Sequence, residues 1–370
     1  MSGPGAIGSY GGPLLPQDDS WMGPEDYGAL SSYNAPLDGG DGIPLRHAGA
    51  GSDWIPQGQG YDETRNQVLT SYYKDDGTVL LSFEDLDPWQ NCKPAKREFS
   101  VELGGTSEDP DNAPGKGGGV ATDGTYVYVA DGGEVFVYRR EDVMAQVAPE
   151  PPDGPVLPGN EPLAGTHSGA TVQAIARIPI DPPNDGNEFT ASYLTIRDGQ
   201  LYVGDFTSTR LTNLASDRDD PTRDAELRRY AIDPETGLFG GARVSGDDAV
   251  AYDSIDAPKY AQGATVTDTG VVFSTSLGSG FFAPADELVF QPTTSTTDAF
   301  STDGDARVIA RLDHYAEGLN IIDGKLWVTH ESAADKYRDN VDDPHDSIRV
   351  YSIDDLDISA EDLGVESGDS

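Results

Sequence analysis

The sequence is poor in the residues that build stapled or metal-centred folds. It has one cysteine, Cys92, in 370 residues, which excludes an intrachain disulfide and a cysteine-based metal site. Its five histidines show no pair at metal-binding spacing, and it has no Gly-x-Ser-x-Gly motif of a nucleophilic serine. It also lacks an apolar run of membrane-spanning length and the basic and apolar pattern of a signal peptide. We therefore expect no membrane insertion.

Basic residues are also few. The chain has 24 Lys and Arg against 65 Asp and Glu, which gives a net charge of −41. Such a charge repels nucleic acids and anionic membrane surfaces and favours cations, basic partners or high salt. The acidic residues are spread along the whole chain, as on a solvated acidic surface. Salt adaptation explains this charge, with calcium binding and lineage bias as alternatives.

Turn-forming residues are abundant, with 44 Gly and 26 Pro, which favours many turns over long helices. A two-strand pattern recurs five times. Each copy has a small or polar first residue, an alternating apolar strand, a turn with Asp or Gly, and a second strand rich in Val, Tyr or Phe. The copies begin near residues 56, 116, 191, 261 and 316. This pattern is typical of β-hairpins.

Further strands are predicted after each hairpin. A third strand lies in GTVLLSFED, EVFVYRRED, ELRRYAIDPETG, DELVFQP and SIRVYSIDDL, and four copies add a fourth in REFSVEL, TVQAIARIPI, ARVSGDDAVAY and ARVIARLDH. Four strands per copy, at a period of roughly 55 to 75 residues, predict an all-β fold, a β-propeller of five blades. The propeller has six blades if the N-terminal region holds a degenerate blade. A β-sandwich or a β-helix is the rival fold.

The repeats divide the chain into three parts. Residues 1–53 are rich in Gly, Pro and Ser and form an arm, either flexible or wrapped over the domain. Residues 54–356 form the propeller, and residues 357–370 form an acidic tail that we expect to be frayed. The last copy has no fourth strand because the chain ends. We predict that the N-terminal arm supplies it, which closes the ring and covers a sheet edge.

Two resemblances are carried by short motifs. The second strands GTYVYVAD, GQLYVGDF and GKLWVTHES resemble those of secreted bacterial β-propellers, and this resemblance covers residues 54–356. The motif AEGL at 316–319 is similar to the channel-glutamate motif of the gluconolactonase and senescence-marker calcium propellers, which have six blades. The first resemblance implies the fold, and the second implies a glutamate at the channel. The remaining metal ligands of those families have no counterpart here.

Two rings of residues are predicted to meet at one face of the propeller. The innermost strand of each blade lines a central channel and begins at the face where the second strand ends; we call this face the channel mouth. The first ring, at the start of the innermost strands, contains Gln57, Gly117, Ser192, Gln262 and Glu317. The second ring, at the ends of the second strands, contains Tyr72, Asp131, Asp205, Ser276 and Glu331, with His330 beside the last.

The first interpretation of these rings is a ligand or metal site. Oxygen atoms that converge on one point suit calcium. Glu317, Gln57 and Gln262 each precede a glycine, which allows the backbone to crowd close to the axis. We predict that this trio is the metal site. Residues that would contact a ligand are Gln57, Gln262, Ser192, Tyr72 and His330.

The second interpretation is catalysis. A pair of carboxylates can act as acid and base on a glycosidic or ester bond. The catalytic candidates are Glu317, Asp131, Asp205 and Glu331. The alternative to both interpretations is a purely structural role. An Asp at a turn commonly bonds its own backbone, and polar side chains can plug a channel.

The sequence therefore predicts a binding or scaffold propeller that acts outside the cell or at its surface, after removal of a leader. A cytoplasmic location is the alternative. It would use the channel mouth and long loops such as 142–170 and 207–224. The expected partner is a small molecule, a glycan or a protein, and not a nucleic acid. The alternative function is a carboxylate-based hydrolase or lyase acting on a carbohydrate or lactone. Calcium is the only cofactor expected.

Overall fold

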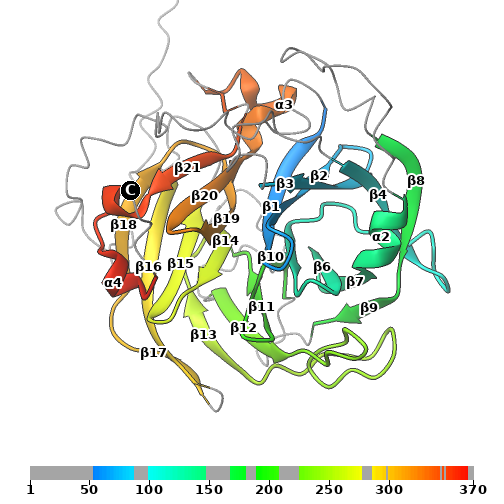
Figure 1. Ribbon diagram of the computed structural model, residues 1–370, viewed down its shortest axis with the longest axis horizontal. Helices are drawn as coiled ribbons and strands as arrows, with labels where there is room; N and C mark the ends of the chain where they lie inside the picture. Colours follow the sequence, from blue (N-terminus) through cyan, green and yellow to red (C-terminus); the bar gives the residue numbers. More distant parts are fainter. Residues whose placement is uncertain are drawn as a thin grey trace, which may run out of the picture.

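The computed structural model describes residues 53–86, 99–146, 167–180, 189–207, 225–276, 286–296, 299–341, 344–345 and 347–365. Its strands form five separate sheets, which Figure 1 shows standing around one axis. In each sheet, neighbouring strands run antiparallel from the axis toward the rim, except that β8 at the rim of the first sheet pairs parallel with β4. The chain is a five-bladed β-propeller, as the repeats predict.

The first three blades follow one plan. Blade 1 consists of β1 (Ile55–Asp62), β2 (Gln67–Tyr73), β3 (Val79–Asp85), β4 (Phe99–Thr106) and, at its rim, β8 (His167–Ala174). Blade 2 consists of β5 (Gly119–Thr122), β6 (Tyr126–Asp131), β7 (Glu134–Arg139) and β9 (Ala176–Pro179). Blade 3 consists of β10 (Ala191–Arg197), β11 (Gln200–Asp205), β12 (Ala225–Ala231) and β13 (Asp253–Ala257).

Blades 4 and 5 differ from the first three blades in the arrangement of their strands. Blade 4 consists of β14 (Ala261–Val266), β15 (Gly270–Thr275), the long β16 (Asp286–Ser295), β17 (Phe300–Thr302) and β18 (Arg307–Leu312). Blade 5 consists of β19 (Ala316–Ile322), β20 (Lys325–His330) and β21 (Arg349–Ser352). Its predicted fourth strand would come from the N-terminal arm, which lies outside the described residues except for Asp53.

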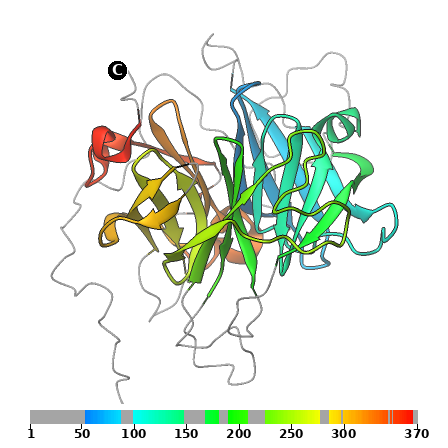
Figure 2. The same ribbon diagram turned by 90° about the horizontal axis from the view of Figure 1, so that it is seen from below.

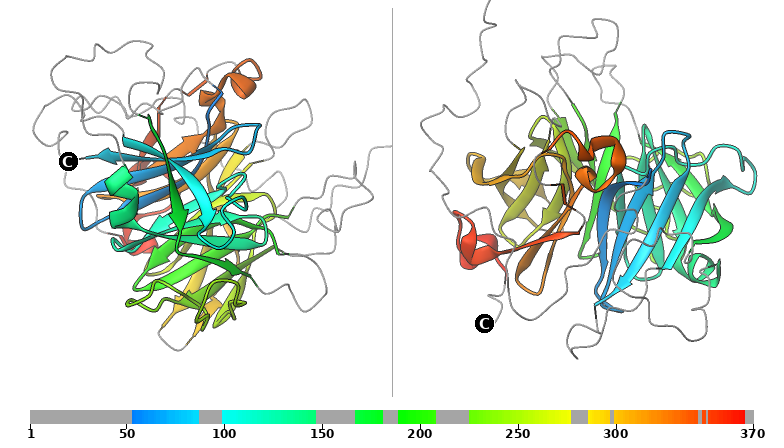
Figure 3. Two further views of the ribbon diagram at one scale, coloured as in Figure 1. Left: turned by 90° about the vertical axis from the view of Figure 1, so that its right-hand side faces the viewer. Right: turned by 90° about the horizontal axis from the view of Figure 1, so that it is seen from above.

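Within the described ranges, the helices are short and peripheral. They are α2 (Arg140–Gln146), α3 (Asp335–Arg338) and α4 (Ala360–Leu363), with single 3-10 turns η3 (Glu331–Ala333) and η4 (Ile353–Asp355). Figure 2 shows the ring from below, with α4 (red) at its edge. Figure 3 shows α3 (orange) beside the first strands of blade 1 (blue). Across the described ranges, no helix is long and apolar enough to cross a membrane.

Apolar side chains fill the spaces between neighbouring blades. Separate cores lie between blades 1 and 2, 2 and 3, 3 and 4, and 4 and 5. In the core between blades 2 and 3, Tyr128 and Tyr230 each contact the ring of Phe239 edge-on, at 6.2 and 5.5 Å between ring centres. Middle strands such as β6 are buried along nearly their whole length because neighbouring blades cover both faces. This burial explains their nearly continuous apolar sequences.

At the axis, the innermost strands lie backbone against backbone. They contact one another in the order β1, β5, β10, β14, β19 and back to β1. A Cβ atom added at Gly58 would lie 2.5 Å from the nitrogen of Val120, and one at Gly318 would lie 2.3 Å from the nitrogen of Gln59. Gly263 has as little room. Side chains larger than hydrogen do not fit such contacts, so glycine sets how closely the blades approach.

The ring closes where blade 5 meets blade 1. The apolar core at this seam is small and consists of Val68, Leu86, Ile322 and Ile348. Polar contacts replace it toward the channel mouth. Thr329 Oγ1 donates to the carbonyl oxygen of Gln57 at 2.8 Å, and Asn320 Nδ2 donates to that of Gln59 at 2.9 Å. The closing seam is therefore more polar than the other blade interfaces.

Two of the predicted outer strands are placed differently. The prediction for residues 242–252 is wrong: they form turns and bends, and the fourth strand of blade 3 is β13. Gly246 has a φ of 88°, which interrupts an extended strand. Residues 171–180 belong to two blades, because β8 pairs parallel with β4 of blade 1 and β9 pairs with β7 of blade 2. The chain crosses between the blades at Ile175.

The tail packs on the propeller as far as the structure describes it. Ile358 and Leu363 are buried in the core between blades 4 and 5. Thr269 Oγ1 donates to the carbonyl oxygen of Asp362 at 2.5 Å. The expectation of a frayed tail is therefore wrong for residues 357–365.

Candidate functional site

The two predicted rings lie at the same face of the propeller. The first residue of each innermost strand pairs with the end of the second strand, as Ala191 does with Asp205 and Ala316 with His330. The segments just before the innermost strands therefore meet those just after the second strands. This arrangement defines the channel mouth.

Two glutamates of blade 5 are buried at the mouth, and we call them the glutamate pair. Glu317, in β19, is 2% exposed, and Glu331, directly after β20, is 7% exposed. Gln57 of blade 1 donates its Nε2 to Glu331 Oε1 at 2.5 Å and to the carbonyl oxygen of Pro56 at 3.0 Å. Within the described part of the chain, neither Gln57 Oε1 nor the Glu317 carboxylate has a hydrogen-bond partner.

Burial governs the protonation of the glutamate pair. Loss of hydration raises the pKa of Glu317 well above its usual range, and the nearby charge of Glu331 raises it further. Burial also raises the pKa of Glu331, while the charge of Lys116 and the hydrogen bond from Gln57 lower it in part. Two buried carboxyl groups that repel each other do not ionise at the same pH. Of the two carboxyl groups, Glu317 therefore keeps its proton to the higher pH.

Asp131 fixes the loop that carries Lys116. Its carboxylate accepts the backbone N–H groups of Gly115 at 3.0 Å, Lys116 at 2.7 Å and Gly117 at 3.3 Å. From blade 1, Ser71 Oγ donates to the carbonyl oxygen of Gly117 at 2.7 Å. Lys116 is exposed and, among the described residues, makes no ion pair at contact distance. The backbone of this loop is thus fixed, and the charge of Lys116 is near enough to lower the pKa of both glutamates in part.

Two further carboxylates at the mouth bond to the backbone. Asp205, which is fully buried, accepts the N–H of Thr190 at 2.8 Å. Asp286 accepts the N–H of Ala316 at 2.9 Å, and burial raises its pKa. Like Asp131, they anchor segments that lead into innermost strands. The four catalytic candidates from the sequence thus fall into two kinds, the buried glutamates and the backbone-bonding aspartates.

The remaining ring residues are spread around the mouth. Ser192 and Tyr72 are buried, and Tyr72 packs with Leu80. Ser276 hydrogen-bonds to Asp286 and thereby lowers the pKa of that carboxyl. Gln262 is half-buried, and in the described chain it shares no hydrogen bond with Gln57 or with Glu317.

A metal site stays a prediction. Among the residues that the structure describes, no group of three or more His, Cys, Asp or Glu side chains is placed to hold a metal ion. The predicted trio comes from three blades. Gln57 bonds to Glu331 through its amide nitrogen, and Gln262 precedes Gly263, whose backbone lies against that of Glu317.

Aromatic rings flank the glutamate pair. The hydroxyl of Tyr73, in blade 1, lies 3.4 Å from that of Tyr337, whose ring packs on Tyr315 at 4.8 Å between centres. The ammonium of Lys336 lies 5.7 Å from the ring centre of Tyr73 and 5.2 Å from that of Tyr337. Burial raises the pKa of Tyr73, and the negative charge of Glu331 raises it further.

Sequence reasoning missed a histidine network beside the mouth. His330 is fully buried, and its ring lies edge-on to that of His345 at 4.6 Å between centres. His345 Nδ1 accepts a hydrogen bond from Arg349 Nε at 2.9 Å, so its proton lies on Nε2, which donates to Asp313 Oδ2 at 2.8 Å. This bond lowers the pKa of Asp313. Sequence spacing carries no signal for it, because the residues meet only in the fold.

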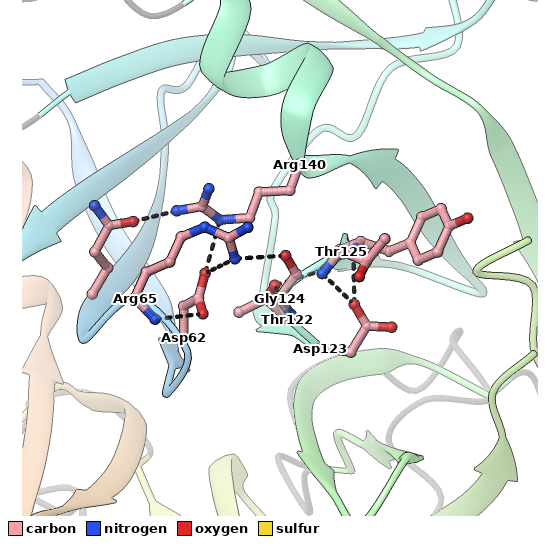
Figure 4. Close-up of polar contacts among 9 residues, drawn as sticks. Asp62, Arg65, Thr122, Asp123, Gly124, Thr125 and Arg140 are labelled. Carbon is pink, nitrogen blue, oxygen red and sulfur yellow. Dashed lines mark hydrogen bonds and ion pairs between the residues drawn. The ribbon is translucent and has the colours of Figure 1, made fainter. Parts of the chain in front are cut away.

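A second polar cluster, at the opposite face, was also missed (Figure 4). Asp62, at the end of β1, is buried and pairs with Arg140 Nε at 2.8 Å and with Arg65 Nη1 at 3.1 Å. Arg65 also donates to the carbonyl oxygen of Gly124 at 2.7 Å, and Arg140 donates to Gln67. The cluster joins blade 1 to blade 2 and uses its donors internally. We interpret it as a structural joint.

Comparisons with known proteins assign no family. No protein-family model matches the chain, and no curated protein matches it. Solved structures that match include a proposed 6-phosphogluconolactonase from Bacteroides uniformis, with 10% identity, a TM-score of 0.38, and coverage of 74% of this chain and 63% of that one. A glucose dehydrogenase also matches, with 11% identity, a TM-score of 0.35, and coverage of 84% of this chain and 83% of that one. A luciferin-regenerating enzyme matches with 10% identity, a TM-score of 0.33, and coverage of 84% of this chain and 94% of that one. At these values, the similarities carry no argument about activity.

Proposed function

We propose that this propeller binds a small polar molecule at the channel mouth, with the glutamate pair as its central contact. One observation carries the proposal: two carboxyl groups are buried at the mouth, and Gln57 alone is hydrogen-bonded to them among the described residues. Burying such groups costs several kcal/mol per ion unless partners compensate for the lost water. A ligand that bonds to both groups would supply this compensation.

The groups around the pair suggest the class of ligand. One protonated and one ionised carboxyl together donate and accept hydrogen bonds, which suits hydroxyl groups. Tyr73 and Tyr337 offer aromatic surface beside them. Lys116, on its fixed loop, suits an acidic group at the far end of the ligand. We infer a polyhydroxylated compound, such as a sugar, a sugar acid or the end of a glycan.

Calcium is the cation that this donor set suits best. Carboxylate and amide oxygens are the ligands that Ca²⁺ prefers, and Glu317, Glu331 and Gln57 carry such oxygens, although Gln57 meets Glu331 through its amide nitrogen. A cation would displace the shared proton, so its affinity would rise with pH. Repulsion from Lys116 opposes it.

A carboxylate-based hydrolase or lyase is the second candidate. It is favoured by the unequal protonation of the pair, because one group that keeps its proton and one that loses it are the two partners of acid–base catalysis. Glu317 would act as the acid and Glu331 as the base, on a carbohydrate or lactone. An extracellular or cell-surface location belongs to the same proposal and is supported only by the resemblance of the second strands.

The test is calorimetric titration of glucose, glucuronate, gluconolactone and calcium chloride into the wild type, Glu317→Gln and Glu331→Gln. Exposed Glu63, on the opposite face, gives the control variant Glu63→Gln. We expect wild type and control to bind at least one compound alike, and both mouth variants to bind it about tenfold or more weakly, because a charge-assisted hydrogen bond is lost. Turnover of the bound compound would identify an enzyme.

The proposal fails if none of the compounds binds to the wild type. Such a result would identify the pair as a plug of the channel. Equal affinity of the wild type and both mouth variants would place the ligand elsewhere on the propeller.

A further inference from the structure

We propose that Gln57 of blade 1 is a positioning residue, which fixes Glu331 as the hydrogen-bond acceptor and Glu317 as the hydrogen-bond donor of the glutamate pair. The meaning of these two roles for a ligand rests on the proposed function, whereas the assignment itself is argued from contacts within the chain. Two buried carboxyl groups that compete for one proton are distinguished by the donors that surround them. A single fixed donor on one of them therefore decides which group ionises first.

The side-chain amide of Gln57 has one orientation that fits its neighbours. Gln57 is fully buried, and its Nε2 lies 3.0 Å from the carbonyl oxygen of Pro56 and 2.5 Å from Glu331 Oε1. A backbone carbonyl oxygen is always an acceptor, so a flipped amide would set Gln57 Oε1 against the oxygen of Pro56. Both N–H groups of the amide are therefore committed, one to Pro56 and one to Glu331.

The backbone that carries this amide is held from three blades. Thr329 Oγ1 of blade 5 donates to the carbonyl oxygen of Gln57 at 2.8 Å. The next residue, Gly58, donates its N–H to Ser71 Oγ of blade 1 at 3.0 Å, and its Cα lies against the backbone of Val120 in blade 2. The donor is thus fixed in space, and Glu331 accepts from it across the seam that closes the ring.

A fixed N–H donor favours the ionised form of Glu331. A carboxylate accepts through both of its oxygens, whereas a protonated carboxyl group accepts more weakly and has to keep its proton away from Oε1, where it would meet the N–H of Gln57. Burial raises the pKa of Glu331, and the bond from Gln57 is one of the effects that lower it in part. The geometry and the electrostatics therefore favour the same form.

Glu317 receives no comparable donor. It is only 2% exposed, and within the described part of the chain its carboxyl group accepts no hydrogen bond. Both blades that flank blade 5 carry a glutamine in the first ring, but Gln262 of blade 4 shares no hydrogen bond with Glu317 among the described residues. Glu317 therefore keeps its proton, which it can donate to an oxygen of a ligand, while Glu331 accepts from a hydroxyl group.

The first test uses the wild type without a ligand. The chain is labelled with ¹⁵N in its glutamine side chains, and the amide protons of Gln57, assigned by their loss in Gln57→Met, are followed by NMR as pH rises. A proton bonded to a carboxyl oxygen shifts when that carboxyl ionises. We expect these protons to shift with the lower of the two ionisation steps of the pair. A shift with the higher step alone, or no shift, would overturn the assignment.

The second test compares two buried glutamines of the same strand. Gln57→Met keeps the length of the side chain and removes the donor. Gln59→Met is the matched control, because Gln59 is 2% exposed and its amide has no hydrogen-bond partner among the described residues. Carboxyl-carbon NMR titration should show the ionisation constant of Glu331 about tenfold lower in Gln57→Met, the order expected when a charged group loses one hydrogen bond. It should be unchanged in Gln59→Met.

An unchanged ionisation constant in Gln57→Met, or an equal fall in Gln59→Met, would show that Gln57 does not position the pair. If Gln57→Met fails to fold, the amide signals of the wild type are assigned through the neighbouring backbone and decide alone. Because no ligand is used, failure of the calorimetric titrations leaves both results untouched.

Discussion

At the scale of single residues, Glu317 is the residue of the first ring whose burial costs the most free energy. The other four blades place Gln57, Gly117, Ser192 and Gln262 there, none of which carries a charge. A carboxyl group in the same position is buried with little compensation. Such a buried carboxyl group lowers the stability of the folded chain, which is typical of residues that have a function.

The cost predicts how stability depends on pH. The pKa of Glu317 in the folded chain lies well above the ordinary value of 4.5, so between the two values the folded state binds more protons than the unfolded state. The free energy of unfolding contributed by this group is therefore complete below pH 4.5 and falls as pH rises. Glutamine does not titrate. We expect Glu317→Gln to be more stable than the wild type at pH 8, because the variant buries no carboxylate at this position.

Urea unfolding of both proteins between pH 5 and pH 8 measures this difference. The gap between them should widen as pH rises. A constant gap, or a variant that is less stable at pH 8, would show that the carboxylate is well compensated in the folded chain.

The sequence predicts part of the site because the hairpin repeat gives each residue a place. Glu317 and Glu331 are placed at the mouth by their positions at the start and end of one hairpin. The partner of Glu331 was not predictable, because Gln57 reaches it only across the seam that closes the ring. The same limit applies to His330 and His345, whose contact depends on the path of the chain after blade 5.

At the scale of elements, glycine in the innermost strands sets the width of the channel. Gly58 and Gly318 allow backbones of adjacent blades to touch, which brings Gln57 of blade 1 within hydrogen-bond distance of blade 5. The structure of the site therefore depends on glycines, which have no functional side chain.

This dependence predicts the effect of a single methyl group. Gly58→Ala would place a Cβ atom 2.5 Å from a backbone atom of blade 2, so the blades must separate. We expect a loss of about 1–3 kcal/mol in the free energy of unfolding, as for other overpacked sites. The control is Gly133→Ala, whose Cβ atom would lie 3.6 Å from its nearest neighbour. Denaturant unfolding should separate the two; equal stabilities would mean that the axis yields without strain.

The sequence predicts the buried inner strands better than the exposed outer strands. The hairpins nearest the axis carry apolar residues on both faces and were placed correctly. The outer strand β13 reads DSIDA, in which only Ile255 and Ala257 are apolar, so its sequence gives a weak strand signal. The more apolar ARVSGDDAVAY was predicted in its place, although Gly246 turns the chain there. The rim strand β8 was assigned to the wrong blade because its parallel pairing is nonlocal.

At the scale of the whole molecule, the apolar cores lie between blades while the net charge is −41. Some of the few basic residues are used internally, as in the ion pair of Arg229 with Asp253 at 2.6 Å and that of Arg140 with Asp62. The acidic excess therefore repels itself across the surface.

Screening of this repulsion predicts a response to salt. Charges farther apart than about 10 Å no longer interact strongly at 0.1 M salt, and this distance shrinks as salt is added. We expect the thermal midpoint to rise with sodium chloride, because self-repulsion destabilises the compact state. Potassium chloride at equal ionic strength should act alike if screening is the cause. A flat or falling midpoint contradicts the prediction, and a rise with one cation only would indicate a specific site.

The central claim is that Glu317 and Glu331 form a buried, proton-sharing pair at the channel mouth. The most direct measurement is a carboxyl-carbon NMR titration of the chain labelled at its glutamates, with Glu317→Gln and Glu331→Gln used for assignment. The account predicts that one carboxyl of the pair is still protonated at pH 7, and that replacing either residue lowers the pKa of the other. Two carboxyls that both titrate near 4.5, with no effect of either substitution on its partner, would contradict it.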